Sequence, residues 1–74
     1  MDRLDQLRTF AAVAERASFA EAARALGVSP TAVSRGVASL EESLGVALLR
    51  RTTRSVALTP EGAAYLVRCR HALD

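Results

Sequence analysis

The sequence predicts a mainly α fold with one small β-hairpin, and three features of the 74-residue chain carry this prediction. Apolar residues recur at helical spacing in separate segments. Glycines and Ser-Pro or Thr-Pro steps stand between these segments, where helices end and begin. Between residues 47 and 58, the apolar pattern changes from a helical period to two short strand-like runs. A chain of this length forms a single domain with a small core.

The first two helices are separated by a capping signal. Residues 3–17 form the first, because Leu4, Leu7, Phe10, Ala11 and Ala14 follow a helical period. Ser18 and Glu21 have the S-x-x-E spacing of a capping box, which begins the second helix. Gly27 ends that helix, since glycine adopts left-handed backbone angles without steric cost. The residues expected to face inward from it are Phe19, Ala22, Ala23 and Leu26.

A third helix is expected from Pro30, with Ser29 as its N-cap and proline at the first helical position. Gly45 ends it. Gly36, in its interior, costs about 1 kcal/mol relative to alanine, and we expect either close approach of the backbone to a ligand or simple sequence drift to account for it. One apolar stripe faces inward and consists of Val33, Val37, Leu40 and Leu44.

Residues 47–58 predict a hairpin in which Leu48-Leu49 and Val56–Leu58 flank the polar tip RRTTRS. Thr59, Pro60 and Glu61 then supply the N-cap, the first helical position and the first-turn acid of a fourth helix, which runs to the last residue. Three helices, a hairpin and a further helix make a winged helix-turn-helix. We assign residues 1–58 to this domain and residues 59–74 to a linker or dimerisation helix.

In a helix-turn-helix, the start of the second helix enters the major groove of DNA. A helical wheel points Thr31, Arg35, Ala38 and Glu42 outward, and Thr31 and Arg35 lie in the turns that reach bases. Arg35 can bind guanine or a phosphate. Ser29 can meet phosphate at the positive end of the helix, although it and Pro30 can also serve only as caps. Pro30 and Thr31 can touch a thymine methyl, and Ser34 can bond a base or phosphate or remain merely solvated.

The wing holds three arginines, Arg50, Arg51 and Arg54. Arginine on a hairpin tip suits a narrow, electronegative minor groove, and we assign this role to Arg54, with Arg50 or Arg51 on the DNA backbone. Two alternatives stay open: a wing that only aids solubility, and an ion pair of Arg50 or Arg51 with Glu41 or Glu42.

The spacing of residues in the fourth helix predicts an exposed stripe through which two copies could associate. It consists of Ala63, Leu66, Cys69 or Arg70, and Leu73. Packing of this stripe onto the first helix is the alternative. Cys69 is the only cysteine, which excludes an internal disulfide and suits a reducing cytoplasm. We find no catalytic pair, no metal-binding cluster and no membrane-spanning run.

The chain resembles the N-terminal DNA-binding domain of LysR-type transcriptional regulators. The resemblance is carried by LRTFAAVAERASFAEAARALGVS at 7–29, AVSR at 32–35, LEESLGVALLRR at 40–51 and LTPEG at 58–62. It implies a bacterial protein about four times as long, whose remaining part binds a small-molecule co-inducer, so no cofactor is expected here. It also implies dimerisation through the fourth helix, a tetramer in the full protein, and DNA contacts at Ser29 to Thr31, Ser34, Arg35 and Arg54.

The sequence departs from the family pattern at Gly36 and Ala38, where longer polar side chains are usual. This leaves more of the specificity to Thr31, Arg35 and DNA shape. The expected partner is double-stranded DNA with an interrupted palindrome. The rival interpretation, a winged-helix module that binds protein, would favour apolar residues at positions 31, 35 and 38, and the chain has Thr, Arg and Ala there.

Overall fold

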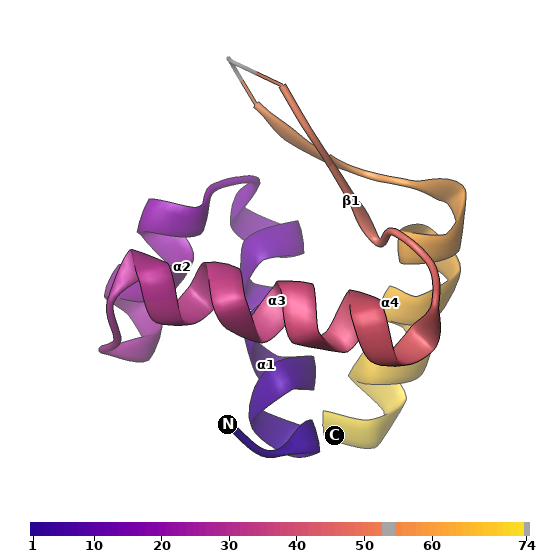
Figure 1. Ribbon diagram of the computed structural model, residues 1–74, viewed down its shortest axis with the longest axis horizontal. Helices are drawn as coiled ribbons and strands as arrows, with labels where there is room; N and C mark the ends of the chain where they lie inside the picture. The colour runs from indigo at the N-terminus through magenta and orange to yellow at the C-terminus, as the bar shows by residue number, and fades with distance from the viewer. Residues whose placement is uncertain (53–54, 74) are drawn as a thin grey trace.

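The computed structural model describes residues 1–52 and 55–73. Three helices precede a two-stranded antiparallel sheet, and a fourth helix follows it, which confirms the predicted winged helix-turn-helix (Figure 1). The elements are α1 (Arg3–Arg16), α2 (Phe19–Leu26), α3 (Pro30–Leu44), β1 (Leu49–Arg51), β2 (Val56–Leu58) and α4 (Pro60–Leu73).

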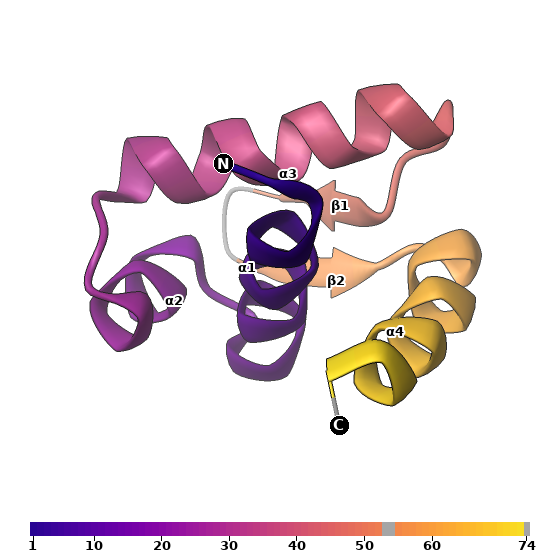
Figure 2. The same cartoon turned by 90° about the horizontal axis from the view of Figure 1, so that it is seen from below.

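The central helix is α1, which contacts each of the other three helices. Figure 2 shows α3 along one side of α1, with α2 and α4 on either side of it. The wing formed by β1 and β2 extends away from the helices (Figure 1). Its strands pair Leu49 with Leu58 and Arg51 with Val56, which confirms the hairpin predicted at residues 47–58.

The predicted helix boundaries follow from hydrogen bonds at the caps. The Oγ atoms of Ser18 and Ser29 accept from the backbone N–H groups of Glu21 and Ala32, each at 3.1 Å. Gly27 and Gly45 have φ values of 71° and 72°, in the left-handed region that glycine favours. The capping box is incomplete, because the Glu21 carboxylate accepts from Arg24 at 2.8 Å.

The core contains Phe10, Val13, Val33, Val37 and Leu40, all with no exposed surface. Three apolar residues expected in the interior are exposed instead: Leu4 (44%), Leu26 (36%) and Leu44 (36%). All three lie in the first or last turn of a helix, where the neighbouring helices no longer cover the apolar stripe.

The end of α3 is joined to the start of the wing by Glu41. Its Oε2 atom accepts from the backbone N–H groups of Leu48 at 2.7 Å and Leu49 at 3.1 Å. The alternative in which Glu41 or Glu42 pairs with Arg50 or Arg51 is wrong, because no such pair occurs among residues 1–52 and 55–73. Glu41 instead accepts from two backbone donors where the chain enters the wing.

The start of α4 is held against the same segment. Thr59 is buried; its Oγ1 donates to the Ala47 carbonyl at 2.7 Å and accepts from the Gly62 N–H at 2.9 Å. Thr59 also donates its own N–H to the Leu48 carbonyl at 3.0 Å. A Cβ atom on Gly62 would lie 1.9 Å from that carbonyl oxygen. The segment Thr59–Gly62 therefore caps α4 and also brings the backbone of α4 into close contact with that of Leu48.

Gly36 faces the interior of the molecule. A Cβ atom there would lie 2.5 Å from the sulfur of Met1 and 3.7 Å from Cγ2 of Thr9. Gly36 is buried against the N-terminal residue, so the expectation that it lets DNA approach the helix backbone is wrong. It makes room for the flexible side chain of Met1.

The predicted self-association stripe on α4 is wrong in two of its members. Leu66 is 6% exposed and Cys69 is 1% exposed, and both belong to the same core as α1. The alternative, in which this stripe packs within one subunit, is correct for these residues. Ala63 and Arg70 are exposed and Leu73 is half-buried. The largest apolar side chain exposed on α4 is Val67, at 54%.

Burial raises the pKa of the Cys69 thiol above its ordinary value through desolvation of the thiolate. We expect Cys69 to react with an uncharged alkylating reagent far more slowly in the folded chain than after denaturation at the same pH, because the reactive thiolate is scarce and shielded. Mass spectrometry of samples quenched at intervals measures the two rates. Equal rates would contradict the burial of Cys69.

Candidate nucleic-acid interface

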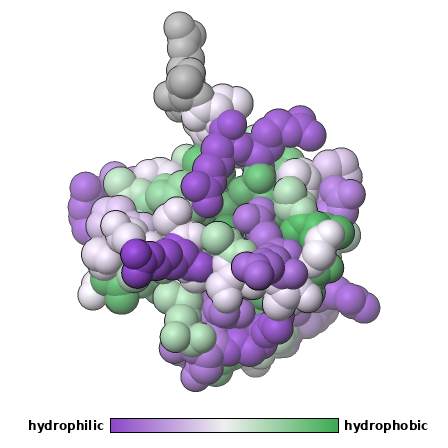
Figure 3. All heavy atoms as spheres, in the orientation of Figure 1, coloured by the Kyte–Doolittle hydropathy of each residue, from purple (hydrophilic) through white to green (hydrophobic). Residues whose placement is uncertain are grey.

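The first turns of α3 form an exposed polar surface. Ser29, Pro30, Thr31 and Arg35 are exposed and Ser34 is half-buried. The wheel prediction is confirmed for Ala38 and Glu42 as well, which are also exposed. In Figure 3, hydrophilic atoms cover much of the face crossed by α3 and gather again near the base of the wing.

Arg35 has no hydrogen bond or ion pair with any residue that the structure describes. Its guanidinium group therefore keeps all five donors available for a ligand. A planar fork of donors fits the O6 and N7 acceptors of guanine, or two oxygens of a phosphate.

Ser29 combines two roles at the helix start. Its Oγ accepts from the Ala32 N–H, so the capping alternative is correct, while its hydroxyl hydrogen stays available. The N-terminal amides of α3 carry the positive end of the helix dipole, which favours an anion. Ser29 can therefore cap α3 with its oxygen and contact a phosphate with its hydroxyl hydrogen at the same time.

The wing places its two described arginines on opposite sides of β1. Successive side chains of a strand alternate between faces. Leu49 is buried, so Arg51 lies on the inner face with it and Arg50 points away. Arg50 is exposed and has no hydrogen-bond or ion-pair partner among residues 1–52 and 55–73. Arg54, predicted for the minor groove, lies outside the described residues.

Arg51 contacts both helices of the helix-turn-helix. Its Cζ atom lies 4.3 Å from the centre of the Phe19 ring, at the start of α2. Its Nη1 donates to Oγ of Ser34, on α3, at a long 3.5 Å. Ser34 therefore uses its oxygen toward Arg51 and has its hydroxyl hydrogen left to donate, which suits an acceptor on DNA.

Sequence reasoning missed Phe19 as part of this surface, because it was assigned entirely to the core. Phe19 is half-buried and packs against the core, while its ring also lies beneath Arg51. The available signal was the strand alternation: once Leu49 is placed inward, Arg51 must face the helices.

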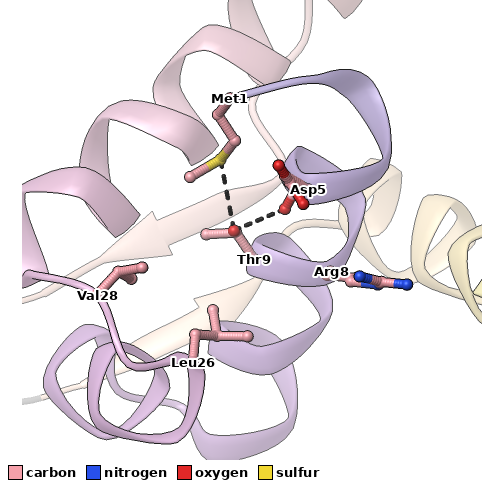
Figure 4. A pocket seen from close by; sticks show the side chains of 6 residues that line it. All are labelled: Met1, Asp5, Arg8, Thr9, Leu26 and Val28. Carbon is pink, nitrogen blue, oxygen red and sulfur yellow. Dashed lines mark hydrogen bonds between the residues drawn. The ribbon is translucent and has the colours of Figure 1, made fainter.

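Two of the hollows among the described residues lie beside α1 on the side of the helix-turn-helix. One, of about 400 Å³, is lined by Met1, Asp5, Arg8, Thr9, Leu26 and Val28. Figure 4 shows Thr9 beneath Met1 in it, with Oγ1 donating to the Asp5 carbonyl at 2.7 Å. The other, of about 360 Å³, is lined partly by Met1, Arg35 and Gly36. Only the second adjoins the α3 surface.

Neither a metal site nor a membrane span is found in the described part of the chain. No three His, Cys, Asp or Glu side chains in this part are grouped so that they could hold a metal ion. None of its helices combines the length and the apolar character that crossing a bilayer requires.

Comparison with known proteins agrees with this geometry. Residues 4–63 match the family model described as "Bacterial regulatory helix-turn-helix protein, lysR family". A probable hydrogen peroxide-inducible genes activator of Streptomyces viridosporus is 54% identical over 70 residues, which are 95% of this chain and 22% of that protein. An HTH-type transcriptional repressor of Pseudomonas aeruginosa is 47% identical over 74 residues, 100% of this chain and 23% of that protein. The chain thus spans less than a quarter of these relatives.

Solved structures include two similar domains in complex with DNA. The DNA-binding domain of CbnR bound to DNA has a TM-score of 0.92 at 42% identity, covering 99% of this chain and 83% of that one. The DNA-binding domain of BenM, bound to a catB site, has a TM-score of 0.92 at 41% identity, covering 99% and 81%. OxyR of Corynebacterium glutamicum has a TM-score of 0.95 at 40% identity, covering 100% of this chain and 23% of that protein.

Proposed function

We propose that this chain, which belongs to the LysR family of bacterial regulatory helix-turn-helix proteins, is the sequence-specific DNA-binding domain of a transcriptional regulator. In this proposal it binds with the start of α3 in the major groove. Arg35 and Thr31 face base edges in this proposal. Ser29 and Ser34 donate to phosphate or base acceptors, and Arg50 meets the backbone. Arg54 enters the minor groove, a role proposed from the sequence alone.

The observation that carries this mode of binding is the exposed guanidinium of Arg35, which has no partner among residues 1–52 and 55–73 and lies near a capped helix N-terminus. Small side chains surround it, since Thr31 and Ala38 are its outward neighbours on α3. A duplex can therefore come close to the helix without a steric barrier. The rival module that binds protein would need an apolar face at these positions.

We also propose that two copies associate through the exposed side of α4, with a tetramer in the full-length regulator. Val67, Ala63 and Arg70 are exposed there, in place of the buried Leu66 and Cys69. A two-fold dimer would bind an interrupted palindrome with half-sites about one or two helical turns apart. A cytoplasmic location, where bacterial DNA lies, and a small-molecule co-inducer bound by the rest of the regulator belong to the same proposal.

Selection from a random duplex pool, followed by fluorescence anisotropy, tests the function. We expect the selected duplex to bind more tightly than its scrambled version. The logarithm of the affinity should fall with the logarithm of the salt concentration, with a slope of about 0.9 per phosphate contacted. Equal affinity for selected and scrambled duplexes at every salt concentration would contradict sequence-specific binding.

A further inference from the structure

We infer that Arg51 is a positioning residue, which fixes the wing at a set angle to the recognition helix by bridging β1 to Phe19 on α2 and Ser34 on α3. The inference rests on the proposed DNA binding and assigns to Arg51 a role within the protein rather than on the duplex. It concerns the described base of the wing, residues 49–52 and 55–58.

The geometry of Arg51 is that of a bridge between three elements. Its Cζ atom lies 4.3 Å from the Phe19 ring centre, within the range of a cation–π interaction. From there its Nη1 reaches the Ser34 hydroxyl at 3.5 Å. A planar guanidinium can stack on a ring and donate at its edge at the same time, which an ammonium group cannot do.

The remaining contacts of the wing base explain why a bridge is needed. Beyond the strand pairing, Glu41 and Thr59 hold the wing at residues 47–49, next to α3 and α4. Arg51 lies at the other end of β1, two residues closer to the tip. From β2, Val56, which pairs with Arg51, and Leu58 also pack against the core. Without the bridge, β1 would lose its tie to α2 and α3 at this level, and the wing would move more freely relative to Arg35.

A fixed wing favours DNA binding because its position is set before the duplex arrives. A flexible wing must lose conformational freedom on binding, which weakens affinity. The loss on breaking the bridge cannot exceed what the bridge contributes, and an exposed cation–π contact corresponds to about a twofold to fivefold change in an equilibrium constant.

The experiment is a double-mutant cycle on the selected duplex, measured by anisotropy at a temperature where circular dichroism shows every variant fully folded. Its members are Phe19→Leu, which removes the ring and keeps all charges, Arg51→Gln, and the pair. Arg50→Gln removes the outward neighbour on β1, which we place on the DNA backbone, and shows what the loss of a phosphate contact looks like: a weaker affinity with a smaller salt slope. We expect Phe19→Leu alone to weaken specific binding about twofold to fivefold with an unchanged salt slope. We expect the double variant to bind the selected duplex no more weakly than Arg51→Gln alone.

Two results would overturn the inference. Unchanged affinity in Phe19→Leu, with a loss in Arg51→Gln and a smaller salt slope, would make Arg51 an ordinary phosphate contact. A lower melting temperature in both single variants with wild-type affinity would make it a stabilising residue only. A wild-type chain that fails to prefer the selected duplex would instead contradict the proposed function, so the two failures are distinct.

A measurement on the free wild-type chain keeps the inference testable even if Phe19→Leu does not fold. Protons of the Arg51 side chain over an aromatic ring are shifted upfield in NMR spectra. We expect such shifts for Arg51 and none for Arg50. Random-coil shifts at Arg51 would overturn the proposed bridge.

Discussion

Replacing Gly62 by alanine is expected to destabilise the domain by about 3 kcal/mol or more, at the upper end for overpacked sites. The added methyl group would lie 1.9 Å from the Leu48 carbonyl oxygen, a backbone atom that cannot move without disturbing Thr59 and β1. Urea denaturation followed by circular dichroism measures the loss. For a small domain this is a large fraction of the total free energy of unfolding.

Gly36→Ala is the matched control, since it adds the same methyl group to another buried helical glycine. Its nearest neighbour is the end of the flexible Met1 side chain, which can turn away, and alanine favours the helix by about 1 kcal/mol. We therefore expect its unfolding midpoint to equal or exceed that of the wild type. Similar losses in both variants would contradict the close crossing at Gly62.

Arg35→Ala is expected to weaken binding to the selected duplex by about 1–3 kcal/mol and to relax one base position. The side chain is exposed on the outer side of α3 and lacks a protein partner among the described residues, so its removal should leave stability nearly unchanged. Anisotropy with the selected duplex and single-base variants of it measures both effects.

Arg68→Ala serves as the control for Arg35→Ala, because it removes the same charge from an exposed position on α4. It should change the affinity for the selected and scrambled duplexes little and equally. If Arg35→Ala weakened both duplexes to the same degree, Arg35 would be a phosphate contact, and the base-reading role would be wrong.

Local signals in the sequence were sufficient for the order of elements and for most of their ends. Ser18, Ser29 and Thr59 each precede a helix and accept from its backbone, and Gly27 and Gly45 end helices in left-handed geometry. Such effects act within a few residues, so they can be read along the chain. The exposed face at Thr31 and Arg35 followed from the same periodicity.

Contacts between distant segments were the part that could not be predicted. Whether Leu66 and Cys69 face α1 or a second copy depends on how α4 crosses α1, which periodicity does not specify. The surroundings of Gly36 depend on the path of the N-terminal residue. From the sequence, the Glu41 carboxylate could equally well have paired with a wing arginine. Only the fold shows that it accepts from the backbone N–H groups of Leu48 and Leu49 instead.

The short connection at residues 47–49 couples α3, the hairpin and α4 into one rigid unit. The side chains of Glu41, on α3, and Thr59, just before α4, hydrogen-bond to the backbone of this connection, and Gly62 of α4 packs against the Leu48 carbonyl. A tilt of α4 would therefore also move the foot of the hairpin and the end of α3. A partner that binds the outer side of α4 would thus also affect the orientation of α3, and of Arg35 on it, relative to that partner.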